Sequence, residues 1–422
     1  MFNLAIALAQ CMVKFVLFLF ISLLHLKVAS QIVGCTDPLA TNYNSSATTN
    51  DGSCTYSPST ISPIASYTLN SSLNETSGLI FWNDTLYTHN DNTDKRLYAL
   101  DSTNGTIVNT YSLASLTNID WEEVSQDSFY VYIGDFGNNA SGNRTNLRIY
   151  KIDKASILNN SPIIDTIKFS YSNQTTYTAT GSNNTDFDCE AFIVTSDSIF
   201  LFTKQWVSKK TSLYSLPKIA GAYTANYLST LDVQGLITGA TYITNKKIIA
   251  LCGYSTLLQP FFYLLYDFNG NKFFSANKRK INMALSFYQT EGITSKNGLK
   301  YFVSNEYFSQ SPIFVPQQLS IFDLSTYLSN YAYPTSIYED HINADQEVIM
   351  YPSITDSELT ITNYNCKGYT HFTLTDIASN MISKGELYDD LTKLNLNQLS
   401  RGVYLITLYS DEIKKTFRLI KN

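Results

Sequence analysis

The chain has few charged residues and few histidines, and each shortage argues against a class of function. Charged residues make up 15% of the 422 residues, the formal net charge is −6, and no basic stretch is long enough to follow a phosphate backbone. Nucleic acid is therefore not expected as a partner. Only four histidines are present, which argues against a multi-histidine transition-metal site. The motif G-x-S-x-G is also missing, so no Ser/His/Asp hydrolase elbow is predicted.

What the chain has in abundance is tyrosine, with 31 residues, together with many Ser, Thr and Asn. Tyr and Thr suit half-buried pleated surfaces, whereas Asn and Ser suit turns. Hydrophobic residues make up 44% of the chain, which is too many for a disordered protein. This composition predicts an all-β extracellular protein, and the length favours two or three modules.

The N-terminus has the pattern of a signal peptide. An apolar run at residues 15–26 follows Lys14 and leads into the small residues 28–30. We therefore predict that residues 1–30 are removed and that the mature chain begins at Gln31. A membrane anchor is the weaker alternative, because this run is shorter than the roughly 20 apolar residues that span a bilayer. Met12 is an alternative start.

The six cysteines predict one disulfide. They are Cys11 in the leader, the pair Cys35 and Cys54, and the isolated Cys189, Cys252 and Cys366. The isolated three are expected to be small apolar filler. The pair brackets an Asn/Asp-rich segment, and a disulfide there suits an exported protein. A lipoprotein box at 32–35 is a rival use of Cys35.

Residues 34–56, GCTDPLATNYNSSATTNDGSCTY, resemble a short disulfide repeat found in secreted bacterial proteins. We therefore expect a small disulfide module at 31–57. A calcium ion at the Asn50–Ser53 turn with Asp37 is one interpretation, and a polar turn without an ion is the favoured one.

The last part of the chain, from about residue 346, has a different texture. Apolar residues alternate over 348–361, 371–382 and 394–422, with turn residues between them. This predicts a small antiparallel sandwich. Tyr351-Pro352, Leu399–Leu405 and the basic-apolar terminus resemble the type A sorting domain of type IX secretion. The resemblance implies export to the outer-membrane cell surface or beyond. It also implies partners: the secretion machinery, its sorting protease, and a surface lipopolysaccharide anchor.

The middle of the chain repeats one outline of two apolar strands around a polar turn. The outline recurs at residues 77–91, 122–135, 190–204, 239–253 and 291–306, usually followed by a third strand. Several strands in each repeat of roughly 40–55 residues are typical of propeller blades. We therefore predict a β-propeller over 58–338, with five legible blades and six as an alternative. Residues 64–69 are candidates to close the ring by adding a strand to the last blade.

Three segments of this region carry a resemblance to known propellers. Asp120–Glu123, Ile133–Asn139 and Asp188–Ala191 resemble secreted bacterial propellers of lactonase-like and SdiA-regulated outline. The resemblance implies the fold rather than an activity.

Aligning the repeats predicts two rings of residues at one mouth of the channel. The first strands begin at Ser77, Glu122, Glu190, Gly239 and Glu291. The second strands end at Asp91, Asp135, Lys204, Gly253 and Glu306. Carboxylates gathered in this way repel one another unless a cation or raised pKa values relieve them. Three interpretations follow: acids that brace neighbouring blades, calcium at Glu122, Glu190 and Glu291, or a catalytic carboxylate pair.

The sequence leaves two classes of function open. A surface module that binds glycan or protein at the channel face is favoured by the lack of a recognised nucleophile. A calcium-dependent hydrolase of a phosphoester, lactone or glycoside is the alternative, favoured by the acidic rings. Whether the protein is an enzyme therefore stays undecided at this stage, with the balance toward a non-enzyme.

Overall fold

The computed structural model describes residues 31–332 and most of 348–421, with gaps at 352–353, 356, 364–368, 377–379, 388–389 and 411–413. The predicted signal peptide lies outside the described residues. The chain divides into two compact units, 1–334 and 335–422. Each unit is described by itself.

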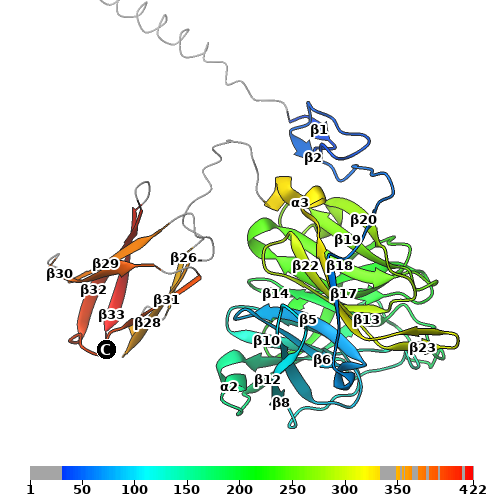
Figure 1. The fold of residues 1–422 in the computed structure, drawn as a ribbon, viewed down its shortest axis with the longest axis horizontal. Coiled ribbons are helices and arrows are strands. Elements are labelled where there is room, and N and C mark those ends of the chain that lie inside the picture. Colours follow the sequence, from blue (N-terminus) through cyan, green and yellow to red (C-terminus); the bar gives the residue numbers. More distant parts are fainter. Residues whose placement is uncertain are drawn as a thin grey trace, which may run out of the picture. The chain divides into compact units, whose positions relative to one another are not determined.

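The first unit contains a propeller of five blades, each built on four antiparallel strands (Figure 1). Blade 1 is β5 (Thr76–Trp82), β6 (Thr85–Asn90), β7 (Arg96–Leu100) and β8 (Ile107–Ser112). Blade 2 is β9 (Trp121–Gln126), β10 (Tyr130–Asp135), β11 (Arg148–Asp153) and β12 (Ile164–Tyr171), with helix α2 (Lys154–Leu158). Blade 3 is β13 (Asp188–Val194), β14 (Ser198–Lys204), β15 (Thr211–Pro217) and β16 (Gly221–Leu231).

Blade 4 is β17 (Leu236–Ile243), β18 (Ile248–Tyr254), β19 (Pro260–Tyr266) and β20 (Asn277–Met283). The short strand β3 (Thr60–Ile61) adds to it, parallel to β20. Blade 5 contains β21 (Thr290–Ser295), β22 (Lys300–Asn305) and β25 (Gln318–Asp323), with the hairpin β23 (Phe308–Gln310) and β24 (Ile313–Val315) inserted before β25. Short 3₁₀ turns lie at Ser71–Leu73, Thr244–Lys246 and Phe273–Ser275, and helix α3 (Ser325–Ala332) follows the last blade.

The ring is closed by the N-terminal strand β4 (Ala65–Thr68), which is the outer strand of blade 5 and pairs antiparallel with β25. This confirms the predicted closure by residues 64–69, and the described ring has five blades rather than six. The inner strands contact one another in the order β5, β9, β13, β17, β21 and back to β5. Five buried apolar clusters fill the spaces between neighbouring blades. Alternation in the strands therefore supplies both faces of every blade with core residues.

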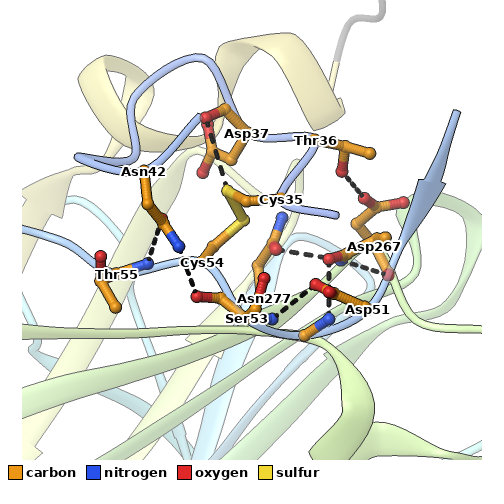
Figure 2. The surroundings of a disulfide bond; sticks show 12 residues. Cys35, Thr36, Asp37, Asn42, Asp51, Ser53, Cys54, Thr55, Asp267 and Asn277 are labelled. Atoms are coloured by element: carbon orange, nitrogen blue, oxygen red, sulfur yellow. Dashed lines mark hydrogen bonds between the residues drawn. A yellow bond between two sulfur atoms is a disulfide. The ribbon is translucent and has the colours of Figure 1, made fainter. Parts of the chain in front are cut away.

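The N-terminal module packs on blade 4. Its strands β1 (Val33–Gly34) and β2 (Thr49–Asn50) pair in parallel, and Cys35 and Cys54 form the predicted disulfide (Figure 2). The carboxylate of buried Asp37 accepts hydrogen bonds from the hydroxyls of Tyr56 and Tyr266, both at 2.7 Å. Thr36 also donates to Asp267 across this contact at 2.7 Å. The polar groups of the module therefore hold it to the propeller.

The second unit is a small β-sandwich. One sheet contains β26 (Val348–Tyr351), β28 (Glu358–Asn363) and β31 (Asp390–Asn395). The other contains β27 (Ile354–Thr355), β33 (Lys414–Lys421), β32 (Gly402–Tyr409), β29 (His371–Asp376) and β30 (Met381–Glu386). Their buried side chains form a single cluster that includes Leu359, Phe372 and Ile406. In the described parts of the chain, no helix has the length and apolar character that crossing a membrane requires.

Candidate functional site at the channel mouth

Each inner strand is irregular at the same place, close to the point where it enters the channel. The pairing register with the second strand shifts beside Ser77, Glu122, Glu190, Thr238 and Glu291 in blades 1 to 5. An irregularity of this kind re-aims the side chain that it carries. The repeated shift therefore explains how one position in five blades can point toward a shared centre. Blade 4 places Thr238 there, so the alignment that chose Gly239 was wrong by one residue.

Two of the five positions carry hydroxyls, and these brace the next blade. Ser77 Oγ donates to the backbone oxygen of Glu122, and Thr238 Oγ1 donates to that of Thr290. The other three positions carry Glu122, Glu190 and Glu291, which are almost completely buried. At this position of the inner strands, the bracing contacts therefore come from the two hydroxyls, and the three glutamates line a common cavity.

This cavity has a volume of about 160 Å³ and brings together six of the seven predicted mouth residues: Asp91, Glu122, Glu190, Lys204, Glu291 and Glu306. Asn139, Asn183, Trp206, Tyr254 and Gln289 complete the lining. Five carboxylates and a single lysine thus line one small cavity.

Asp135, the seventh predicted residue, does not line the cavity. Its carboxylate lies 2.8 Å from Arg144 and 3.5 Å from Arg148. The reason is register. The backbone N–H of Phe136 donates to Asp120 O at 3.2 Å, as that of Glu306 donates to Gln289 O at 3.1 Å. Phe136 is therefore the counterpart of Glu306, and a shift of one residue turns the side chain to the other face. Gly253 is displaced in the same way, because Tyr254 lines the cavity.

One group of acids, which we call the inner trio, contains Glu122 and Glu190, which line the cavity, and the buried Asp188. One carboxylate oxygen of each lies within 4.8 Å of the others. Lys204 Nζ lies 2.8 Å from Glu190 Oε1, and Asp188 accepts from Asn138 N at 2.6 Å and from the Trp206 indole at 2.7 Å. The inner trio therefore has partners of its own within the protein.

Burial dominates the titration of the inner trio. It raises the pKa of Glu122 and Glu190 well above the usual value, and neighbouring carboxylates add to the shift. Burial acts to lower the pKa of Lys204, but Glu190 and the other acids outweigh it and hold that pKa well above its usual value. The lysine ammonium also lies 4.8 Å from the ring centre of Trp206 and 5.3 Å from that of Tyr254. Lys204 is thus a fixed cation at pH 7.

A second group, which we call the outer trio, contains Glu75, Asp91 and Glu306. One oxygen of each again lies within 4.8 Å of the others, and all three residues are partly exposed. Burial, followed by Glu75 and Glu291, raises the pKa of Asp91 to about 7. Burial, followed by Glu291 and Asp91, raises that of Glu306 well above its usual value. Among the described residues, no ion pair joins this trio to a lysine or arginine.

Glu291 borders the same cavity and is 3% exposed. Burial raises its pKa to about 7. Its Oε2 is buried and has no hydrogen-bond partner among the described residues. Of the predicted calcium ligands, Glu122 and Glu190 lie in one group with Asp188, and Glu291 is not part of that group.

Glu123, the residue after Glu122, is completely buried and links two blades that are not neighbours. Its carboxylate accepts from Val124 N at 2.9 Å and from Ala240 N at 2.7 Å. Ala240 belongs to blade 4, which does not neighbour blade 2, so this side chain crosses the channel. Burial raises the pKa of Glu123 well above its usual value, although the N–H donors oppose the shift. An acid that braces two blades was predicted at Glu122, and this role is found at the next residue, Glu123.

Several mouth residues did not emerge from the repeat alignment, namely Glu75, Asp120, Asp188 and Tyr254. The sequence did contain a signal for two of them. In Asp120-x-Glu122 and Asp188-x-Glu190 the acids are two residues apart, and residues two apart in a strand lie on the same side. Gly137 gives a second signal. A Cβ there would lie 1.9 Å from Glu122 Oε1 and 2.4 Å from Asp120 Oδ2, so only glycine allows these acids to approach the loop.

In the N-terminal module, the groups considered for calcium have internal partners. Asp37 accepts from two tyrosines, Asn50 Oδ1 accepts from Gly52 N at 2.9 Å, and Asp51 Oδ1 accepts from Ser53 N at 2.9 Å. These contacts are those of a polar turn.

Comparison with known proteins assigns the C-terminal unit. Residues 349–422 match the family described as the secretion system C-terminal sorting domain. The protein is exported through type IX secretion. Its destination is the cell surface or the extracellular space. No curated protein matches the chain.

Solved structures with low similarity were also found. The extracellular domain of a provisionally assigned hybrid two-component system from B. thetaiotaomicron is 10% identical, with a TM-score of 0.31, and the match covers 85% of this chain and 60% of that one. The chain thus spans less than two thirds of that protein's length. The WD40 repeats of RRP9 are also 10% identical, with a TM-score of 0.31, over 58% of this chain and 67% of that one. The count of five blades rests on the strand pairings of this chain.

Proposed function

We propose that the protein is a surface-displayed binding module that holds a glycan or protein ligand at the mouth of its channel. The observation that carries the proposal is the acidic cavity, which opens at the centre of one face of the ring. An acidic cavity favours ligands with a cationic group or with hydroxyls that donate hydrogen bonds.

The loops around this mouth support a large ligand. By strand direction, the connections at the mouth face carry seven exposed apolar side chains: Ile119, Tyr177, Val207, Leu257, Phe287, Tyr307 and Phe314. Leu257 is 82% exposed and Phe314 63%. Exposed aromatic and aliphatic groups around a polar centre are typical of binding faces. The apolar rim would provide contact area, and the cavity would select the group at the centre.

A screen of the exported chain tests this function. The wild type would be applied to a glycan array and to extracellular proteins, each with calcium and with chelator. Any ligand found would then be measured against Phe314→Ser, a rim variant, and Phe129→Ser, a matched variant of an exposed residue on the opposite face. We expect at least a tenfold loss of affinity for the first and less than a twofold change for the second. Equal losses of affinity in the two variants would mean that the ligand does not bind at the mouth face.

A calcium-dependent hydrolase is the second candidate, supported by the raised pKa values of buried acids, which suit general acid chemistry. Phosphoester, lactone and glycoside substrates, assayed with the same preparations, distinguish the two. Turnover that is lost in Glu122→Gln would favour the enzyme.

Export leads to a further proposal about processing. The sorting domain implies contact with the type IX machinery, and we propose that a sorting protease removes roughly the last 75 residues before attachment to lipopolysaccharide or release. Intact-mass analysis of surface and culture fractions should find a chain that starts near Gln31 and lacks the sandwich. A full-length product in the cytoplasm would contradict this.

A further inference from the structure

We propose that the outer trio, Glu75, Asp91 and Glu306, binds a calcium ion at the seam between blades 5 and 1, with Glu291 beside it. The geometry thus moves the expected metal site away from Glu122 and Glu190. The proposal goes beyond the binding of a glycan or protein and does not require that function to be correct.

The seam holds the three carboxylates in place through the backbone. Asp91 N donates to Glu75 O at 3.0 Å, which fixes two ligands within blade 1. Tyr307 N, the residue after Glu306, donates to Asn74 O at 2.8 Å, the residue before Glu75. Ring closure by β4 therefore brings together acids from opposite ends of the propeller sequence. The ligands are positioned before any ion arrives, which lowers the entropy cost of binding.

The outer trio lacks the compensation that the inner trio has. Lys204, the lysine that lines the cavity, is engaged with Glu190 at 2.8 Å. Carboxylates held within 4.8 Å of one another must share protons or bind a cation. The independent sign of a missing ligand is Glu291, which borders the same cavity as Asp91 and Glu306. Its buried Oε2 lacks a hydrogen-bond partner in the described structure. An unpaired buried carboxylate oxygen is costly, and a cation would satisfy it.

The donor set selects calcium among common metals. All the candidate ligands are carboxylate oxygens, which hard cations prefer, and neither histidine nor cysteine lines the cavity. Calcium takes 6–8 oxygens in flexible geometry, so three or four carboxylates leave positions for water in a partly open site. Export places the protein where calcium modules bind with dissociation constants of roughly 10⁻⁴–10⁻³ M.

Terbium luminescence provides a direct test on the exported chain. Terbium replaces calcium and emits when a nearby aromatic ring is excited, and Trp206 and Tyr254 line the same cavity. Titration should give a saturable signal that calcium competes away. Glu306→Gln and Asp91→Asn should weaken calcium binding at least tenfold. The matched variant Glu122→Gln, which removes one charge from the inner trio, should change it less than about threefold.

Three outcomes would overturn the proposal. Calcium binding could be weakened more by Glu122→Gln than by the other two variants, it could be weakened equally by all three, or the wild type could give no saturable signal. Circular dichroism in chelator checks that each variant is folded, and a variant that is not folded is replaced by Glu75→Gln. Because the readout is the ion, failure to find a glycan or protein ligand would leave this result unaffected.

Discussion

Two groups of three carboxylates lie at one channel mouth, and they differ in what surrounds them. The inner trio has an ammonium at 2.8 Å, an indole N–H at 2.7 Å and a backbone N–H at 2.6 Å. The outer trio is more exposed, yet it has no ion-pair partner among the described residues. The number of acids is the same, so their partners decide the difference. Two acids of the inner trio, Glu190 and Asp188, have donors within the chain, whereas the outer trio is suited to bind something from solution.

Removing the ammonium of Lys204 should have the largest effect on the stability of the protein. Lys204→Met leaves Glu190 buried without its partner, and breaking a buried pair in this way costs about 3–5 kcal/mol. We expect a loss of this size in the free energy of unfolding from urea denaturation at pH 7. The loss should be smaller at pH 5, where Glu190 is more easily protonated.

Lys209→Met is the matched control for this variant. The Lys209 ammonium lies 5.9 Å from the ring centre of Trp206 and donates to the backbone oxygen of that residue. We expect a loss of about 1 kcal/mol, as for a single partly buried hydrogen bond. Equal losses in the two variants would mean that Glu190 and Lys204 are not a coupled pair.

The fold was largely readable because each blade repeats alternating apolar strands around a polar turn. The inference that 64–69 close the ring was available because those residues alternate and precede the first full blade. The fold could therefore be predicted from local patterns. The number of blades required the actual strand pairings, because the long segment between β10 and β13 left room for a sixth.

The site was less readable, for two physical reasons. A strand period of 2 makes an error of one residue decisive. Asp135 was placed at the mouth, but the register counterpart of Glu306 is Phe136, whose side chain is buried in the apolar core. Glu75 precedes its strand and lay outside the aligned repeat. The division into two trios depends on which blades are neighbours and on which carboxylate Lys204 contacts. Neither can be predicted from the sequence of a single repeat.

Asp37 offers a third way to hold a buried carboxylate, with neutral donors alone. Two tyrosine hydroxyls at 2.7 Å and Leu39 N at 2.9 Å satisfy it. Asp37→Ala should cost about 1–3 kcal/mol, because these donors lose their acceptor. Thermal denaturation with and without calcium should show the same loss. A loss that calcium removes would instead point to an ion in the N-terminal module.

A pH dependence of stability is expected from two further acids of the mouth, Glu291 and Asp120. Burial raises the pKa of Glu291 from 4.5 to about 7 and that of Asp120 from 3.8 to about 6, so the folded state binds more protons than the unfolded state in this range. Stability from these groups is therefore complete below about pH 4 and is lost as the pH rises through 6 to 7. In chelator, we expect the free energy of unfolding to fall by on the order of 1–2 kcal/mol per group between pH 5 and 8.

Glu291→Gln should reduce the dependence of the free energy of unfolding on pH. Calcium should reduce it in the wild type by raising the free energy of unfolding at pH 8. The control is Glu358→Gln in the sandwich, where the carboxylate is about half exposed and its removal should leave the slope unchanged. A wild-type slope of opposite sign would mean that these acids are ionised at no cost in the folded protein.

The smallest expected effect concerns the blades in which the ring position is not acidic. Thr238 Oγ1 donates to Thr290 O, so Thr238→Val removes one neutral hydrogen bond between blades 4 and 5 while keeping the shape of the side chain. The cost should be about 1 kcal/mol, measured by urea denaturation, and it should be the same with calcium and with chelator. Ser77→Ala should behave in the same way at the seam of blades 1 and 2.

A calcium-dependent loss in Thr238→Val would show that the hydroxyl belongs to the ion site, since Thr238 adjoins Glu291. Equal losses with and without calcium would confine the ion to the acids and leave the hydroxyl blades with bracing alone.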